Sequence, residues 1–186
     1  MPRSGADARR RLQQAALDLY RERGFDRTTA ADIAERAGVN TRTFFRHFPD
    51  KREVLFDGEA DLRAALTRYV AEAPDGLSPV EVLLRAFREA AHILEDSRPF
   101  SEPRLALIAT TPTLRERDLA KGEAMAAALA EALCRRGVRR RVADLAAHTG
   151  WAAFHHAAQN WIDDPEVGLD AHLVRAFEDL GALFRA

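Results

Sequence analysis

Residues 28–52 read TTAADIAERAGVNTRTFFRHFPDKR, and two short helical patterns in this stretch flank a turn at 38–40. The first pattern gathers its apolar residues on one face: Ala30, Ile33, Ala34 and Ala37. Thr29 precedes it, where a threonine hydroxyl accepts a backbone N–H that the first helical turn leaves unpaired. Gly38 follows it and can adopt the left-handed conformation that ends a helix.

The second pattern predicts a helix that is capped by Asn40 or Thr41 and buries Phe44 and Phe48. Two helices joined by a three-residue turn that contains glycine form the helix-turn-helix outline. The second helix of this motif enters the major groove of DNA. The stretch therefore favours DNA recognition.

The side chains that this second helix leaves outside the core suit DNA. Arg42 can form two hydrogen bonds with guanine, and a threonine methyl such as that of Thr41 or Thr43 can contact the thymine methyl. Other cationic or hydrogen-bonding groups follow and would reach phosphates: Arg46, His47 and Lys51. A solvated charged face on an ordinary helix pair is the alternative interpretation.

Several motifs recur here at defined spacing: Gly24-Phe25, Thr28-Thr29, Asp32-Ile33-Ala34, Ala37-Gly38-Val39, TFFRHF at 43–48, and Lys51. In order and spacing, residues 8–56 resemble the DNA-binding domain of the TetR family of bacterial transcription regulators. The resemblance implies an all-α fold, in which a three-helix helix-turn-helix domain precedes a helical bundle that binds an effector and dimerises.

The resemblance also implies a role for each matched residue. The implied contacts with the DNA backbone are Thr29, Thr43, His47 and Lys51, and the implied base readers are Thr41 and Arg42. Position 45 is usually tyrosine in the family, so Phe45 cannot donate the expected hydrogen bond to a phosphate but can pack against a sugar or a thymine methyl. Asn40 and Arg46 complete the predicted DNA-binding set.

Charge is distributed unevenly along the 186 residues, whose net charge is −1. Residues 1–52 contain 12 Arg or Lys and 7 Asp or Glu, whereas residues 53–186 contain 16 and 22. A basic end is typical of a nucleic-acid-binding segment. We expect a DNA-binding domain over 1–52 and a helical effector-binding and dimerisation domain over 53–186.

Helical periodicity continues through the rest of the chain. A helix over 7–23 would cover the helix-turn-helix, and a long helix from about 51 to 73 would lead into the second domain. Further helices are predicted over 78–95, 100–110, 113–136, 138–162 and 166–185, with the last break at Asp163-Asp164-Pro165.

Other features bound the class of protein. Cys134 is the only cysteine, which excludes an internal disulfide and a cysteine-rich metal site. The chain lacks a run of about 18 apolar residues that would span a membrane, and its basic start continues into an amphipathic helix instead of an apolar signal core. We expect a cytoplasmic protein without a cofactor.

The last two helices carry apolar stripes. Those in the final helix recur at steps of three and four residues: Leu169, Leu173, Phe177, Leu180 and Phe184. Both stripes could face the protein's own core, but a two-fold dimer would double the contacts with a palindromic site. TetR-like proteins pair through their last two helices, so we expect a homodimer with this interface: Trp161, Leu169, Leu173, Phe177 and Leu180.

The middle helices mix bulky apolar residues with a few polar groups, as small-molecule sites do. Each residue taken alone is more typical of an ordinary core than of a ligand site. Residues 105–117 (LALIATTPTLRER) and the alanine-rich helix after them resemble the TetR-like subgroup with acyl-CoA-like ligands. This resemblance implies a pocket for a small effector, with these candidates: Phe87, Ile108, Met125, Trp151, Phe154 and His155.

A helical-bundle enzyme or a scaffold without DNA binding is the rival hypothesis. Glu89 and His92 form one Glu-x-x-His pair, but a di-iron site needs a second pair and two further glutamates. The sequence lacks a nucleophile elbow, a phosphate loop and a dinucleotide fingerprint. A scaffold would not explain the basic end. The sequence therefore predicts a repressor, not an enzyme, that binds palindromic double-stranded DNA as a homodimer and responds to an effector.

Overall fold

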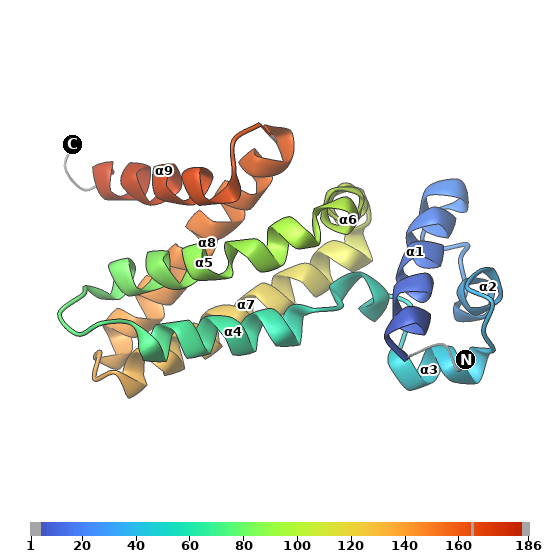
Figure 1. The fold of residues 1–186 in the computed structure, drawn as a ribbon, viewed down its shortest axis with the longest axis horizontal. Coiled ribbons are helices and arrows are strands. Elements are labelled where there is room, and N and C mark those ends of the chain that lie inside the picture. Colours follow the sequence, from blue (N-terminus) through green and yellow to red (C-terminus); the bar gives the residue numbers. More distant parts are fainter. Residues whose placement is uncertain (1–4, 165, 184–186) are drawn as a thin grey trace. The chain divides into compact units, whose positions relative to one another are not determined.

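The computed structural model describes residues 5–164 and 166–183, and every regular element within these ranges is helical (Figure 1). The elements are α1 (Gly5–Arg23), α2 (Ala30–Arg36), α3 (Thr41–His47), the 3-10 helix η1 (Glu53–Phe56), α4 (Glu59–Glu72), α5 (Pro79–Asp96), α6 (Arg98–Thr110), α7 (Pro112–Arg135), α8 (Arg140–Asp163) and α9 (Leu169–Ala182). The all-α prediction is confirmed. Pro165 of the last predicted break and Phe184 of the final stripe lie outside the described residues.

The chain folds into two compact units that are not simply its two halves. One unit contains the chain up to Glu59 together with Pro99–Arg117. The other contains Ala60–Arg98 and the chain from Asp118 onward. Helix α6 and the first turns of α7 therefore belong to the same unit as α1, α2 and α3. A single division after residue 52 describes this arrangement only coarsely.

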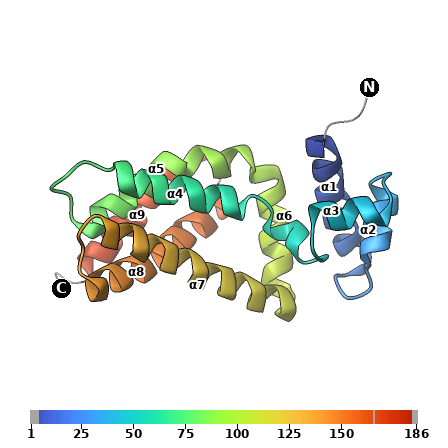
Figure 2. The same ribbon diagram turned by 90° about the horizontal axis from the view of Figure 1, so that it is seen from below.

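The first unit has its core between α1, α2 and α3, which form one group in both views (Figures 1 and 2). The residues predicted for the inner face of α1 are all buried: Leu12, Ala15, Ala16, Leu19 and Tyr20. They meet Ile33 and Ala34 of α2, Phe44 of α3 and its C-cap Phe48. Apolar burial of this kind stabilises a fold by about 25 cal/mol per Å², so the helix-turn-helix is supported by α1.

The long helix predicted from about 51 to 73 is wrong. Residues Glu53–Phe56 form η1, Gly58 has a φ of 86°, and α4 begins only at Glu59. Val54, Leu55 and Phe56 are consecutive and all buried. Successive side chains of an α-helix lie about 100° apart and cannot all face one core. The chain instead leaves the α-helical path, and glycine permits the turn that follows.

The second unit is a helical bundle whose core joins aromatic side chains with many leucines and alanines. Ser78 and Glu81 cap α5 reciprocally, through side-chain to backbone hydrogen bonds of 3.3 and 2.7 Å. Helix α8 packs against α5 and α9. The approach of α5 is close, because a Cβ added to Gly150 would lie 2.9 Å from Leu83 Cδ1. None of the described helices has the length and apolar character that crossing a bilayer requires.

Candidate nucleic-acid interface

Helix α2 begins at the predicted N-cap Thr29, and the structure shows in addition that the cap is reciprocal. The Thr29 hydroxyl accepts the Asp32 N–H at 3.1 Å, and the Asp32 carboxylate accepts the Thr29 N–H and hydroxyl hydrogen, both at 2.8 Å. The Thr29 backbone N–H, followed by its hydroxyl, holds the pKa of Asp32 below its usual value. The Thr29 hydroxyl is thus already occupied within the protein.

The turn between α2 and α3 is held by backbone geometry and by one arginine from α1. Gly38 has a φ of 66°, the left-handed conformation expected for it. The Val39 N–H then reaches the Ala34 carbonyl at 3.0 Å. Arg11 donates to the Ala37 carbonyl at 2.7 Å and so satisfies an oxygen at the end of α2. No spacing in the sequence indicated this role for Arg11.

Helix α3 is fixed at its start and along its inner face. The Asn40 side chain accepts the Thr43 N–H at 2.8 Å, so Asn40, and not Thr41, is the N-cap. Phe44 and Phe48 are buried beneath the helix. Phe45 is 54% exposed, and the centroid of its ring lies 5.3 Å from that of Phe44. Helix α3 therefore has little freedom to reorient.

The outer face of α3 presents the side chains that the sequence assigned to DNA. Thr41, Arg42 and Arg46 are exposed, while Thr43 and His47 are half-buried. The guanidinium groups of Arg42 and Arg46 form no hydrogen bond or ion pair with any other residue of 5–164 and 166–183. The guanidinium groups of Arg42 and Arg46, on a helix whose orientation is fixed, are thus available to an external ligand.

His47 closes α3 in a less polar setting. Its Nε2 atom is buried and has no hydrogen-bond partner among the described residues. Burial lowers the pKa of His47, the charges of Arg46 and Arg9 lower it further, and Asp57 opposes them. The neutral imidazole is therefore favoured in the protein without DNA.

Lys51 is used by the protein itself. Its ammonium donates to the carbonyls of Phe25 at 2.8 Å and Thr28 at 2.9 Å, with Asp26 O at 3.5 Å. It also lies 4.2 Å from the centroid of the Phe25 ring. These contacts hold the loop between α1 and α2, which the sequence did not indicate.

Comparison with known proteins identifies the family. A sequence model described as "Bacterial regulatory proteins, tetR family" matches residues 12–57, which contain α2, the turn and α3. A second model, described as "MftR C-terminal domain", matches residues 77–185, more than half of the chain. The chain belongs to the TetR family of bacterial transcriptional regulators.

Individual relatives and structures agree with this assignment. TcmR of Streptomyces glaucescens is 30% identical over 134 residues, which cover 69% of this chain and 59% of TcmR. MftR of Mycobacterium tuberculosis is 24% identical over 192 aligned positions, covering 98% of this chain and 96% of MftR. Thermus thermophilus FadR in complex with lauroyl-CoA is 28% identical, with a TM-score of 0.55 and 91% of each chain covered. The SmeT–triclosan complex, at 21% identity, has a TM-score of 0.65 over 95% of this chain and 90% of that one, and shares the fold.

The effector-pocket residues predicted for this TetR-family chain do not form one group. Phe87, Met125 and Phe154 lie in the core of the second unit, and Trp151 packs against it. His155 lies at the edge of Trp151, with ring centroids 4.8 Å apart. Ile108 is instead buried in the core of the first unit and does not join the other five. Among the described residues, no three His, Cys, Asp or Glu side chains are grouped to hold a metal ion.

Four of the five predicted dimer-interface residues lie in the core of their own protomer. Leu169 and Leu173 are fully buried, and Trp161 and Phe177 nearly so, while Leu180 is half-buried. The structure therefore favours the alternative, that the stripes of α8 and α9 face the protein's own core. They do so because α9 packs against α8 and α5.

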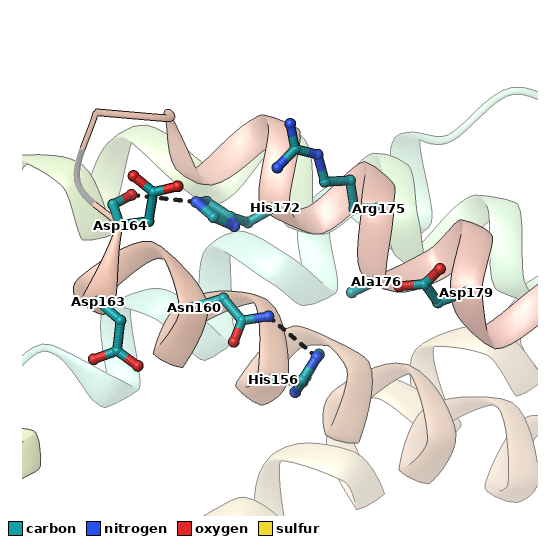
Figure 3. Close-up of a pocket in the computed structure, with 8 residues that line it drawn as sticks. All are labelled: His156, Asn160, Asp163, Asp164, His172, Arg175, Ala176 and Asp179. Atoms are coloured by element: carbon teal, nitrogen blue, oxygen red, sulfur yellow. Dashed lines mark hydrogen bonds between the residues drawn. The ribbon is translucent and has the colours of Figure 1, made fainter.

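Another face of the α8–α9 pair forms a polar groove of about 350 Å³ (Figure 3). It is lined by His156, Asn160, Asp163 and Asp164 from α8 and its C-cap, and by His172, Arg175, Ala176 and Asp179 from α9. Two hydrogen bonds organise it, Asn160 to His156 at 3.1 Å and His172 to the Asp164 carbonyl at 3.3 Å. The side chains of Arg175, Asp163 and Asp179 form no hydrogen bond or ion pair with the described residues.

Proposed function

We propose that this TetR-family regulator is a repressor that binds a palindromic operator as a homodimer through α3. The observation that carries the proposal is the exposed, unpartnered Arg42 on a helix fixed by the Asn40 cap and by Phe44 and Phe48. A side chain held ready on a rigid element binds with little loss of conformational freedom. The N-terminal end of a recognition helix is where base edges are read.

The surroundings of each residue support a division of roles. Thr41 and Arg42 would read bases, and Thr43, Arg46 and His47 would contact the DNA backbone. Phe45 is exposed enough to pack on a sugar or a thymine methyl. The polar groups of Thr29, Asn40 and Lys51 serve the protein's own backbone. We propose that these three position the interface.

Replacement of Arg42 tests this proposal. With an operator selected from random duplexes by the wild-type protein, Arg42→Ala should weaken specific binding by about 1–3 kcal/mol and relax the preference at one base pair per half-site. Fluorescence anisotropy on operator and scrambled duplexes measures both. Arg139→Ala is the matched control, since Arg139 is exposed in the second unit. An equal loss on both duplexes from Arg42→Ala would make Arg42 a phosphate contact and contradict the assignment.

We further propose that the second copy docks on the polar groove between α8 and α9. Two-fold symmetry would bring each Arg175 toward carboxylates such as Asp163 of the partner subunit. Each protomer would then supply both the positive and the negative group of two equivalent contacts. Support comes from the unpartnered charged groups at the groove and from the burial of the apolar stripes. A dimer also supplies the two recognition helices that a palindromic operator requires.

A small hydrophobic or acyl-bearing effector is proposed for the second unit. Its core contains a continuous aromatic cluster, in which the Phe87 and Phe154 centroids are 4.8 Å apart and the Phe87 and Trp151 centroids 6.3 Å apart. The lauroyl-CoA complex of T. thermophilus FadR supports this class of ligand. The effector would release the operator by favouring a second conformation, which requires a differential affinity of about 1–3 kcal/mol.

A further inference from the structure

The segment 53–57, directly after the helix-turn-helix, is held from two directions within the first unit. From α1, Arg9 Nε and Gln13 Nε2 donate to the Asp57 carboxylate at 2.6 and 3.0 Å. From the corner between α6 and α7, Arg117 Nε donates to Glu53 Oε1 at 2.7 Å, and Arg104 donates to the Leu55 carbonyl. The contacts from α1 and from the corner thus converge on five consecutive residues.

The α6–α7 corner, defined as residues 99–117, is integrated into the DNA-binding unit. Ile108 and Leu114 are buried in the same core as the helices of the helix-turn-helix. The Arg104 guanidinium also lies 5.3 Å from the centroid of the Phe56 ring. Glu53 is largely shielded from water, with 16% of its side chain exposed, so its pair with Arg117 is less weakened by solvent than a surface ion pair.

The same corner is continuous with the rest of the molecule. Helix α7 runs without a break from Pro112 to Arg135, and it passes into the second unit after Arg117. In the second unit, Met125 and Leu129 of α7 are buried in the core. Arg117 therefore joins segment 53–57 to a helix that is anchored in the other unit, and Arg104 joins the same segment to α6.

We propose that Arg104 and Arg117 are positioning residues for operator binding, although neither lies in the helix-turn-helix. By holding segment 53–57 to the α6–α7 corner, they set the separation of the two recognition helices in the dimer. Half-sites of a palindrome lie a fixed number of helical turns apart. When the first helix-turn-helix is bound, a loosely held second one has a lower effective concentration at its half-site. This inference rests on the proposed dimeric operator binding.

Comparison of a full operator with a single half-site tests the inference. Arg117→Gln and the double variant Arg104→Gln/Arg117→Gln should lower affinity for the full palindrome about tenfold or more, because two-site binding is weakened. Affinity for a half-site duplex should stay within about twofold, because each recognition helix is intact. One base pair inserted between the half-sites should lower the operator affinity of the wild-type protein more than that of the variants.

Two further variants separate positioning from general effects. Arg115→Gln removes the same charge from the same corner, but Arg115 donates to the Ala109 carbonyl and forms no hydrogen bond or ion pair with segment 53–57, so affinity for the full operator should not change. The charge-reversed pair Glu53→Arg/Arg117→Glu should recover affinity for the full operator. Circular dichroism on each variant verifies that the helices are retained.

The remaining outcomes overturn the inference. An equal loss on the half-site and the full operator would mean that the corner is needed to form the DNA-binding surface itself. Unchanged affinity for both duplexes would mean that these arginines do not set the separation of the two recognition helices. If the wild-type protein binds a half-site as tightly as the palindrome, the dimeric function fails first and the inference fails with it.

Discussion

At the scale of single residues, Lys51 already has partners within the protein that its sequence context did not indicate. The family resemblance placed it on a phosphate, whereas its ammonium binds three backbone carbonyls between α1 and α2. The Tyr20 hydroxyl in turn donates to the Lys51 carbonyl at 2.6 Å, and burial of this phenol raises its pKa well above the ordinary value. Lys51 is therefore a structural residue of the DNA-binding unit.

Replacing Lys51 should accordingly change stability more than salt dependence. Lys51→Met keeps the aliphatic stem but removes the donors, and we expect a loss of about 1–3 kcal/mol in the free energy of unfolding, measured by urea denaturation. The slope of DNA affinity against salt concentration should stay near the wild-type value. Arg46→Ala is the contrasting variant: it should flatten that slope by about one unit and leave stability unchanged. The opposite pattern would restore Lys51 to the DNA contacts.

His47 predicts a pH dependence of stability. Because burial lowers its pKa in the folded protein, the unfolded chain binds the proton more readily. The free energy of unfolding should therefore decrease as the pH falls through about 6.5, the ordinary histidine value. His148 has a raised pKa, owing first to the Asp144 carbonyl and then to Glu123, and so contributes with the opposite sign.

Comparison with a His47→Gln variant isolates the contribution of His47, since His148 titrates in both proteins. The variant should lose less stability on acidification than the wild-type protein in parallel thermal or urea titrations. Identical pH profiles for the two proteins would show that His47 is protonated as easily when folded as when unfolded. A nearby phosphate would favour the charged imidazole, so operator binding should also take up a proton at this site.

At the scale of elements, local sequence signals predicted α2 and α3 correctly but did not predict the 3-10 helix η1. Thr29, Gly38 and Asn40 act within four residues of their own positions, through caps and one left-handed turn. The apolar run Val54-Leu55-Phe56 has the composition of a helix, but burial of all three side chains ended the α-helical path. At this segment, packing against the surrounding core overrode the local preference for an α-helix.

The two faces of α9 give opposite expectations for substitution. Leu173 is fully buried in its own protomer, so Leu173→Asp should destabilise the fold by about 3–5 kcal/mol as an uncompensated buried charge. Arg175 lines the polar groove, and Arg175→Glu should leave helical content unchanged while yielding monomers and weakening binding to the palindrome. Sedimentation and thermal melting followed by circular dichroism measure both. A folded, monomeric Leu173→Asp variant would return the dimer interface to the apolar stripe.

At the scale of the whole molecule, effector binding should appear as added stability. A ligand that binds only the folded protein adds about 2.7 kcal/mol at a hundredfold excess over its Kd. We expect a rise in melting temperature with an acyl-CoA thioester such as lauroyl-CoA or with a planar aromatic drug. The same compound should release the operator, and Trp151→Ala should reduce both effects without changing DNA binding in its absence.

The control for this experiment lies in the first unit. Ile108 was grouped with the pocket by sequence but packs in the DNA-binding core, so Ile108→Val should lower stability slightly and leave the ligand-induced shift intact. If neither class of compound shifts the melting temperature, the proposed class of effector is wrong. A shift that persists in full in Trp151→Ala would place the ligand away from the aromatic cluster.

The sequence by itself determined the features whose causes are local. Helical periodicity, the Thr29 and Asn40 caps and the turn at Gly38 depend on neighbouring residues, and they made the all-α class and the helix-turn-helix predictable. The uneven charge and the motif spacing of 24–51 indicated a DNA-binding protein before any fold was known.

Only the tertiary structure decided which distant residues meet. Arg117 pairs with Glu53 across 64 positions, and Lys51 reaches the Phe25 carbonyl across 26. Leu173 could have faced a partner or its own core, since periodicity defines a stripe but not what covers it. Long-range pairing depends on how helices pack against one another. The residues next to an apolar or charged side chain in the sequence do not indicate which distant surface that side chain will contact.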